Sequence, residues 1–218
     1  VRKLPAIETL GAATVICSDK AGTLTRNEMT VRAVAIASTT VEVTGSGYIP
    51  EGEFTLDRTP LAENALEREP ILRILRAAAL VNDATLSNSD GRWRVQGDPT
   101  EGALIVAARK AGITEEELAK YPRIAEIPFT SERKRHTTLH LDPKDPDLLH
   151  IFCKGAPEIL LTHCRHLLDG DQIVALSEPR CAEISGRNDD LAGHALRTLA
   201  IATRTMTASE LGIDPRTV

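Results

Sequence analysis

The distribution of apolar and polar residues along the chain predicts alternating strands and helices. Short β-branched or alternating runs predict strands at 14–17, 29–37, 39–44, 92–97, 123–129, 135–142, 148–155 and 197–204. Helical spacing and start signals predict helices at 63–83, 98–112, 114–121, 156–164 and the first part of 178–206. The body of the first helix is expected to begin at Pro70, and 44–54 and 82–91 are expected to be a turn and a polar loop.

The start of the helix at 98–112 is the best-defined boundary. Asp98 has the N-cap place, Pro99 the first helical position, and Glu101 the third position of a capping box. Gly112 stands at the C-terminal end.

This order of elements predicts an α+β body with a mainly antiparallel sheet flanked by helices. The strand at 14–17 need not belong to that sheet. It is also compatible with one strand of a separate parallel sheet.

Composition restricts the class of protein. The 218 residues are 42% hydrophobic and 26% charged, which suits one large or two small globular domains with a real core. Aromatic residues make up only 3%, so the core must consist of Ala, Leu, Ile and Val. We find no apolar stretch of about 18 residues and no signal peptide, and expect an excised soluble part of something longer.

The formal net charge of −5 argues against non-specific nucleic-acid binding. A small anionic ligand stays possible, because a local basic cluster such as Ser131–Arg135 can hold one; a solvated hairpin turn is its alternative. The four cysteines form no CxxC pair and suggest reduced thiols of a cytosolic protein. The string Thr162–His166, with two histidines around a cysteine, is interpreted as a helix end rather than a zinc site.

The stretch after the first predicted strand carries candidate chemistry. A strand that ends at Asp19 and turns through Gly22 presents a carboxylate at a sheet edge where α/β proteins bind ligands. Aspartate can attack phosphorus and form an acyl phosphate. Lys20, Thr23 and a magnesium ion could neutralise the incoming phosphoryl group. An Asp-Lys pair by itself is common in turns, so only the surrounding residues can indicate whether Asp19 and Lys20 are functional.

That string, CSDKAGTLTRNEMTV at 17–31, resembles the phosphorylation signature of P-type ATPases, normally CSDKTGTLT. Eight of nine core residues match, Ala21 stands where the family has threonine, and NEMTV looks like the branch that contains calcium and sodium pumps. The strings GDPTEGAL, IPFTSERKR, KGAPE and ALRTLAIATR resemble further family motifs in the expected order, at 97–104, 127–135, 154–158 and 195–204. The resemblance therefore covers nearly the whole chain.

The resemblance implies a role for each matching residue. Asp19 would accept the γ-phosphate of ATP, with Lys20 and Thr23 beside it, and Asp19 and the backbone carbonyl of Ala21 would bind Mg²⁺. Five residues fall where the family contacts the nucleotide: Glu101, Phe129, Lys134, Lys154 and Arg197.

Each nucleotide contact has an alternative explanation. Phe129 could stack on adenine or belong to the core. Lys134 and Lys154 could lie beside adenine and phosphates or be solvated surface lysines. Arg197 could pair with phosphate or be an ordinary helix-face arginine. Glu101 could accept from the adenine amino group, complete the capping box, or do both.

The resemblance also implies a domain division and a cellular setting. Residues 1–30 would begin a Rossmann-like phosphorylation domain, 31–204 would form the nucleotide-binding domain, and 205–218 would return to the phosphorylation domain. The remaining phosphorylation, actuator and transmembrane domains of the same chain would be its partners. The transported ion would be a metal cation, with calcium expected from the branch, and the chain would be a cytoplasmic domain of an integral protein of the plasma membrane.

We expect the chain itself to bind ATP but neither to transport ions nor to phosphorylate itself rapidly, since nothing after Arg204 matches the family's magnesium-binding aspartates. The alternative function is a degenerate nucleotide-binding or regulatory interaction module, with Ala21 as its mark. A haloacid-dehalogenase-type phosphatase is disfavoured, because Lys20-Ala21 does not supply the second aspartate of a DxD signature.

Restoring the threonine hydroxyl at position 21 is expected to accelerate phosphorylation. Removing one preorganised donor costs on the order of 10²–10³ in rate, so Ala21→Thr in the complete pump should raise the rate of aspartyl phosphate formation by about that factor. Rapid-quench measurement of acid-stable phosphoenzyme tests this. Equal rates for the two proteins would refute the role of the hydroxyl.

Overall fold

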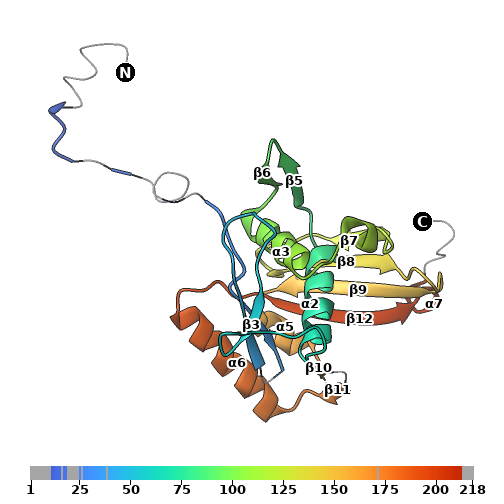
Figure 1. The fold of residues 1–218 in the computed structure, drawn as a ribbon. Helices are drawn as coiled ribbons and strands as arrows, with labels where there is room; N and C mark the ends of the chain where they lie inside the picture. The colour runs from blue at the N-terminus through green and yellow to red at the C-terminus, as the bar shows by residue number, and fades with distance from the viewer. Residues whose placement is uncertain are drawn as a thin grey trace.

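The computed structural model describes residues 11–15, 17–18, 25, 27–37, 39–170 and 172–212. In this part the helices are α2 (Arg68–Leu80), α3 (Pro99–Lys110), α4 (Glu115–Leu118), α5 (Pro157–His163), α6 (Glu178–Gly193) and α7 (Ala208–Leu211) (Figure 1). The strands are β1 (Ala33–Ile36), β2 (Thr39–Val43), β3 (Phe54–Leu56), β4 (Thr59–Pro60), β5 (Thr85–Ser89), β6 (Arg92–Gln96), β7 (Arg123–Ile127), β8 (Arg135–Leu141), β9 (Leu148–Gly155), β10 (His166–Asp169), β11 (Gln172–Ala175) and β12 (Ala200–Thr207).

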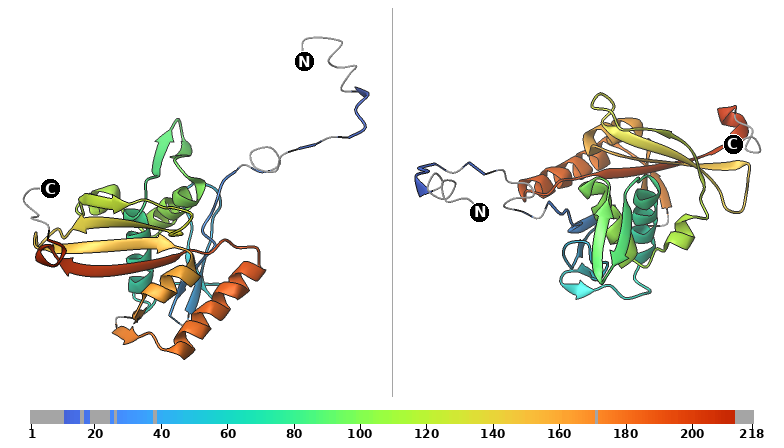
Figure 2. Two further views of the ribbon diagram at one scale, coloured as in Figure 1. Left: turned by 180° about the vertical axis from the view of Figure 1, so that it is seen from behind. Right: turned by 90° about the horizontal axis from the view of Figure 1, so that it is seen from above.

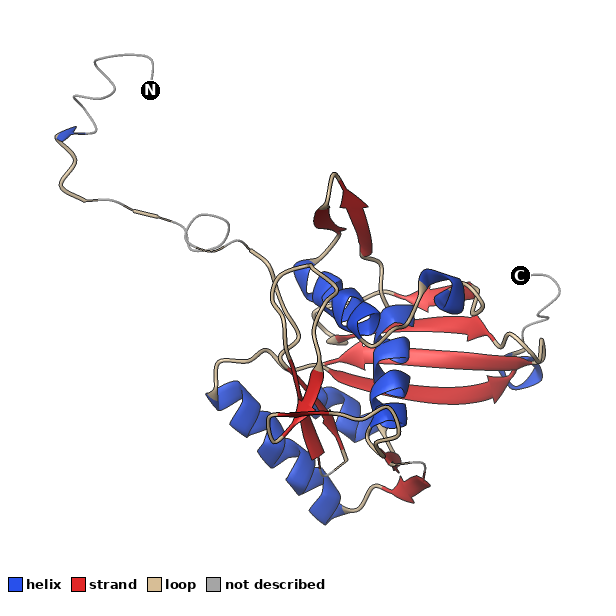
Figure 3. Cartoon of the chain, in the orientation of Figure 1, coloured by secondary structure: helices blue, strands red, loops and turns tan. Residues whose placement is uncertain are grey.

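The described strands form two four-stranded sheets and two hairpins, with every pairing antiparallel (Figure 3). The large sheet has the order β12-β9-β8-β7, and the N-terminal sheet has the order β1-β2-β3-β4. The predicted α+β class with a mainly antiparallel sheet is therefore confirmed. No helix among the described residues is long and apolar enough to span a bilayer.

Helix α2 connects the two sheets because it is buried on two faces. Ile71 and Leu75 join the core formed with Val41 and Phe54 of the N-terminal sheet and with α3. Leu80, near the end of the same helix, contacts Phe152 of β9 on the large sheet. Figure 2 shows α2 and α3 together on one side of the large sheet. Because it is buried on two faces, α2 contributes to both cores. Each fully buried Ile or Leu stabilises the fold by about 1.5–3 kcal/mol.

Helix α3 begins as the sequence predicts, but its capping box is incomplete. Asp98 Oδ1 accepts hydrogen bonds from the backbone N–H groups of Thr100 and Glu101 at 2.8 and 3.2 Å, and Pro99 is the first helical residue. The carboxylate of Glu101 accepts instead from the N–H of Asp83 at 3.3 Å and from Lys154. The capping-box role of Glu101 is therefore wrong, because tertiary partners outcompete the local one.

The predicted loop at 82–91 is wrong, since it contains β5, which pairs with β6. Only Leu86 of β5 is buried, so the strand lacks the apolar alternation that predicts one. A signal was nevertheless present: Asp90-Gly91, with φ of 54° and 73°, is the two-residue turn sequence typical of tight hairpins. The hairpin β3–β4 turns through Asp57 and Arg58, both at positive φ without a glycine, and gave no such signal.

The predicted strand at 14–17 is not formed in the described residues. Thr14, Val15 and Cys17 are exposed, Val15 by 76%, and have no strand structure. A strand requires a hydrogen-bonded neighbour, and the described part of the chain supplies none to this segment.

A neutral histidine lies within the large sheet. His140 on β8 is 2% exposed, and its ring packs edge-on against Phe152. Nδ1 lies 2.8 Å from the carbonyl of Tyr121, which can only accept, so Nδ1 carries the proton and Nε2 accepts from the hydroxyl of Thr138 at 3.0 Å. Burial lowers the pKa of His140, and the charges of Arg123 and His150 lower it further.

Acidification below the ordinary histidine pKa of about 6.5 is expected to destabilise the fold through His140. Because the pKa of His140 is lowered in the folded protein, the unfolded chain binds a proton at this residue at a higher pH than the folded chain does. The free energy of unfolding is therefore undiminished above the ordinary histidine pKa and decreases as the pH falls from that value toward the lowered pKa. At pH 5.5 the loss from one such group is at most about 1.4 kcal/mol. Urea unfolding at pH 7.5 and 5.5 should show a smaller pH dependence for His140→Gln, whereas His166→Gln, on an exposed ring, should match the parent. The same pH dependence in both variants would contradict this assignment.

Candidate functional site

The candidate motifs gather at one end of the large sheet. Strand β7 ends at Ile127 and β8 begins at Arg135, so the loop between them carries the string at 127–135. On the neighbouring strands, Arg135 pairs with Gly155, and Gly155 pairs with Ala200. Antiparallel pairing therefore brings together three segments that lie far apart in sequence.

The loop between β7 and β8 is held in shape by Arg133. Its guanidinium donates to the carbonyls of Ile127 and Pro128 at 3.3 and 3.0 Å and to the hydroxyl of Thr137 at 3.3 Å. The basic cluster predicted from the sequence is thus divided. Arg133 is used within the loop, while Lys134, in a left-handed conformation at φ 50°, is exposed.

Gly155 permits a close approach between the loop and the end of β9. A Cβ atom there would lie 2.5 Å from the carbonyl oxygen of Lys134 and 2.7 Å from Cβ of Arg135, closer than side chains tolerate. The N–H of Ala156 donates to the same carbonyl of Lys134 at 3.1 Å. The glycine therefore fixes the turn after Lys154 against the β7–β8 loop.

The structure decides several of the alternatives left open by the sequence. Phe129 is 61% exposed, so the core role is excluded. Arg197 lies in the loop between α6 and β12 rather than on a helix face, and its guanidinium donates to the hydroxyl of Thr100 at 3.1 Å. Arg197 thereby links the start of β12 to the first turn of α3.

Glu101 and Lys154 form an ion pair with each other. The side chains are 17% and 10% exposed, so the alternative of a solvated surface lysine is wrong for Lys154. The pair joins the first turn of α3 to the end of β9. Two of the five predicted contact residues are therefore paired with each other.

His136 lies beside this pair and was missed by the sequence analysis. It pairs across the sheet with Lys154 and is 4% exposed, with Nδ1 3.9 Å from Oε1 of Glu101. Burial lowers the pKa of His136, and the charge of Lys154 lowers it further. The ring is therefore held neutral. Nothing in the local sequence distinguishes it from the other histidines.

Arg123 donates hydrogen bonds to two carboxylates near His136, and the sequence analysis did not predict this role either. One guanidinium nitrogen, Nη1, donates to Asp83 at 2.6 Å and to Glu126 at 2.9 Å, while Nη2 donates to the backbone carbonyls of Leu80 and Asn82. The hydrogen bond from Arg123 lowers the pKa of the Asp83 carboxyl. These contacts tie β7 to the C-terminal end of α2.

The predicted catalytic and magnesium-binding residues Asp19, Lys20, Ala21 and Thr23 lie outside the described residues. The string at 162–166 is a helix end, as predicted, because α5 ends at His163 with Cys164 as its C-cap.

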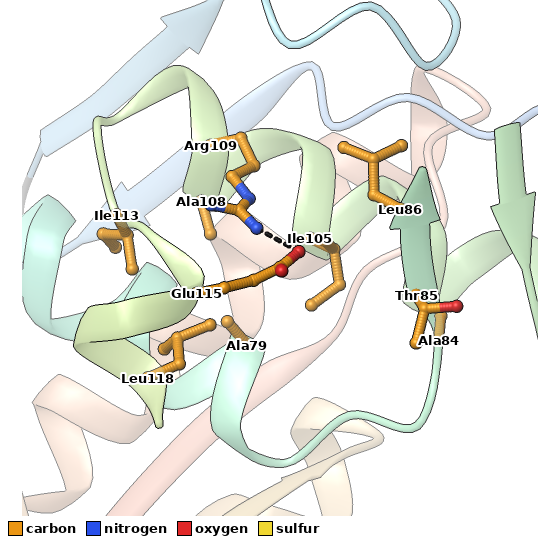
Figure 4. A pocket seen from close by; sticks show the side chains of 10 residues that line it. All are labelled: Ala79, Ala84, Thr85, Leu86, Ile105, Ala108, Arg109, Ile113, Glu115 and Leu118. Atoms are coloured by element: carbon orange, nitrogen blue, oxygen red, sulfur yellow. Dashed lines mark ion pairs between the residues drawn. The ribbon is translucent and has the colours of Figure 1, made fainter. Parts of the chain in front are cut away.

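Two cavities lie elsewhere in the molecule. One of about 180 Å³ lies among α2, α3, α4 and β5 and is bordered by the ion pair of Arg109 with Glu115 (Figure 4). The other, of about 610 Å³ and mainly apolar, lies among α2, α5, α6, β9 and β12. Neither is lined by any of the five predicted contact residues.

Comparison with known proteins gives a consistent result. Residues 70–217 match the family model described as P-type ATPase, cytoplasmic domain N. The chain is 42% identical over 211 residues to a calcium-transporting ATPase of Bacillus subtilis, covering 96% of this chain and 23% of the relative. It is 43% identical over 219 residues to a cation-transporting ATPase of Synechocystis, covering 98% of this chain and 23% of the relative.

A more distant relative has a similar name. The calcium-transporting ATPase type 2C member 1 of Bos taurus is 37% identical over 207 residues, covering 93% of this chain and 21% of the relative. The chain thus spans about a quarter of the length of the curated relatives that it matches.

The pairing of Glu101 with Lys154 predicts a non-additive effect on stability. Lys154→Met leaves the largely buried Glu101 without a counter-charge and should lower the free energy of unfolding by up to about 3–5 kcal/mol, the range for fully buried pairs. The double variant Glu101→Gln/Lys154→Met should recover much of that loss, since no buried charge remains. Urea unfolding measures both.

Arg73→Met provides the matched control, because Arg73 pairs with Glu69 on the exposed face of α2 and should change stability by less than about 1 kcal/mol. Additive losses from Lys154→Met and Glu101→Gln would show that the two residues do not act as a buried pair.

Proposed function

The chain belongs to the P-type ATPase family, as part of cytoplasmic domain N, and from this premise we propose that it binds ATP for an ATP-driven cation pump. In this proposal Glu101, Phe129, Lys134, Lys154 and Arg197 contact the nucleotide, whose γ-phosphate is transferred to Asp19.

The observation that carries the proposal is the exposed ring of Phe129 in the β7–β8 loop, which also carries the exposed Lys134. An aromatic side chain that is 61% exposed provides a face on which adenine can stack, a contact worth about 1–3 kcal/mol per base. The loop around it is shaped by Arg133 and by the contact with Gly155, so the ring is presented by an ordered scaffold. Stacking requires little adjustment of such a surface.

The charges at the sheet end favour a polyphosphate. Three cations, Lys134, Lys154 and Arg197, lie in the segments that meet there, against the carboxylate of Glu101. Lys134 and Arg197 are exposed and can turn toward phosphate oxygens, Arg197 through a planar fork and Lys134 as a point charge. Although the whole chain carries a net charge of −5, this local positive field attracts an anionic ligand.

The proposed reaction is transfer of the γ-phosphoryl group to a carboxylate. An oxygen of Asp19 attacks the γ-phosphorus, the bond to the bridging oxygen breaks, and ADP leaves with that electron pair. Bound Mg²⁺ supplies the charge neutralisation that such transfers require. Lys20 and Thr23 would stabilise the transferring group.

The relatives named as calcium- and cation-transporting ATPases support a metal cation as the transported species. The phosphorylation, actuator and transmembrane domains of the complete pump would be the partners of this part. The proposed location is the cytoplasmic face of a membrane, the plasma membrane in the first instance.

Removal of the exposed ring is expected to weaken ATP binding. Phe129→Ala should raise the dissociation constant for ATP by about 5- to 150-fold, equivalent to the loss of one stacking contact, without lowering the thermal midpoint. Isothermal titration calorimetry measures the affinity. Leu66→Ala is the matched control, since Leu66 is 89% exposed and lies in the segment before α2, away from the sheet end. Equal affinity in Phe129→Ala and the parent would exclude stacking on this ring.

A further inference from the structure

Three potential metal ligands converge behind the Glu101–Lys154 pair. One ligand atom each from Asp83, Glu126 and His136 lies within 4.8 Å of the other two, the one such group found in the described part of the chain. Asp83 follows α2, while Glu126 on β7 and His136 on β8 lie on the same face of adjacent strands, since Glu126 pairs with Thr138. The group is therefore built from three different elements.

The buried imidazole of His136 lacks a partner on one side. Its side chain is 5% exposed, and Nε2 has no hydrogen-bond partner in the described structure. That nitrogen faces Glu126, with Oε2 3.9 Å away. A buried ring nitrogen without a partner loses its hydration without compensation, so a bound ligand at this place would satisfy it.

The other ring nitrogen of His136 faces a carboxylate that could become its hydrogen-bond acceptor. Nδ1 lies 3.9 Å from Oε1 of Glu101, and a carboxylate that accepts from the second ring N–H is the common outer partner of a metal-bound histidine. A shift of about 1 Å in Glu101 would complete this hydrogen bond.

We propose that Asp83, Glu126 and His136 form a binding site for one divalent transition-metal ion of the Zn²⁺ type. His136 Nε2 and one oxygen from each carboxylate are the ligands, and water completes the coordination. None of the three ligands belongs to the residues assigned to ATP, but Glu101, the outer partner of His136, does.

The donor set determines the class of ion. Imidazole together with two carboxylates suits Zn²⁺, Co²⁺ and Mn²⁺, whereas Mg²⁺ and Ca²⁺ prefer oxygen ligands alone. Zinc bonds of about 2.0–2.2 Å require the three ligand atoms to approach one another by roughly 1 Å. Asp83 and Glu126 can make this movement because their side chains are 57% and 46% exposed.

Arg123 contacts both carboxylate ligands and is expected to lower the affinity of the site for a metal ion without preventing binding. Its Nη1 hydrogen-bonds Oδ1 of Asp83, which leaves Oδ2 for the metal. The same Nη1 also hydrogen-bonds Oε2 of Glu126, the oxygen that faces His136 Nε2, so a metal ion would share this oxygen with Arg123. Hydrogen-bonded carboxylates are common in metal sites, where the outer partner orients the ligand. The positive charge of Arg123 opposes a divalent cation, so we expect moderate affinity.

The test is metal titration of the 218-residue chain without nucleotide. Cobalt(II) chloride is followed by visible d–d absorption and zinc chloride by calorimetry, both in a non-chelating buffer. One equivalent is expected to bind to the parent. His136→Asn and Asp83→Asn should each weaken binding by about tenfold or more, the scale seen when even outer partners of metal ligands are removed.

Two controls separate this site from adventitious binding. His166→Asn changes one of the two exposed histidines of the string at 162–166 and should bind like the parent. Asp83→Asn provides the decisive variant if His136→Asn fails to fold, because Asp83 is largely exposed.

The outcomes are distinct. Loss of the single equivalent in both ligand variants, with retention in His166→Asn, supports the site. No binding by the parent, unchanged binding in Asp83→Asn, or loss only in His166→Asn would each overturn it and leave the three residues as an ion-pair network.

Discussion

The pairing of β9 along both edges is the constraint on which the site depends. Because β8 and β12 hydrogen-bond to opposite edges of this strand, Gly155 lies between Arg135 and Ala200. The loops before these two strands and the turn after β9 must then meet at one sheet end. The absence of a side chain at Gly155 allows the turn to contact the backbone of Lys134 directly. A sheet thus converts residues from three distant segments into neighbours.

Helix α2 also stabilises this end of the large sheet by packing beneath it. It is buried on two faces, and its C-terminal end leads into Asn82 and Asp83, which contact Arg123 and Glu101. The side-chain amide of Asn82 donates to the carbonyl of Glu101 at 3.0 Å and so ties the end of α2 to the first turn of α3. Apolar packing and polar contacts therefore determine the same arrangement.

Paired, largely buried charges restrict how the elements at this end of the sheet can be arranged. Pairing two largely buried ions rarely adds much net stability over an apolar pair, but an unpaired one is costly, so such a pair permits few alternative arrangements. Glu101 and Lys154 fix the distance between α3 and β9 in this way, and Arg123 does the same for α2 and β7. In a member of the P-type ATPase family, this arrangement leaves Phe129, Lys134 and Arg197 exposed, while His136 is buried beside the Glu101–Lys154 pair.

The sequence by itself determined the class of fold, the N-cap of α3, a helix end within 162–166 and the family, because these depend on local periodicity, local hydrogen bonds and contiguous motifs. The sequence analysis missed the β5–β6 hairpin, although Asp90-Gly91 is a turn sequence typical of hairpins. It treated β5 as a loop because that segment lacks apolar alternation. The segment at 14–17 did not form a strand, because a strand needs neighbours that the described residues lack.

Only the tertiary structure decided that Phe129 is exposed, that Lys154 is buried with Glu101, and that Arg133 serves its own loop. It alone brought His136, Arg123 and Asp83 to the same place. Burial and long-range pairing depend on which strands lie side by side, and no local pattern of residues encodes that order.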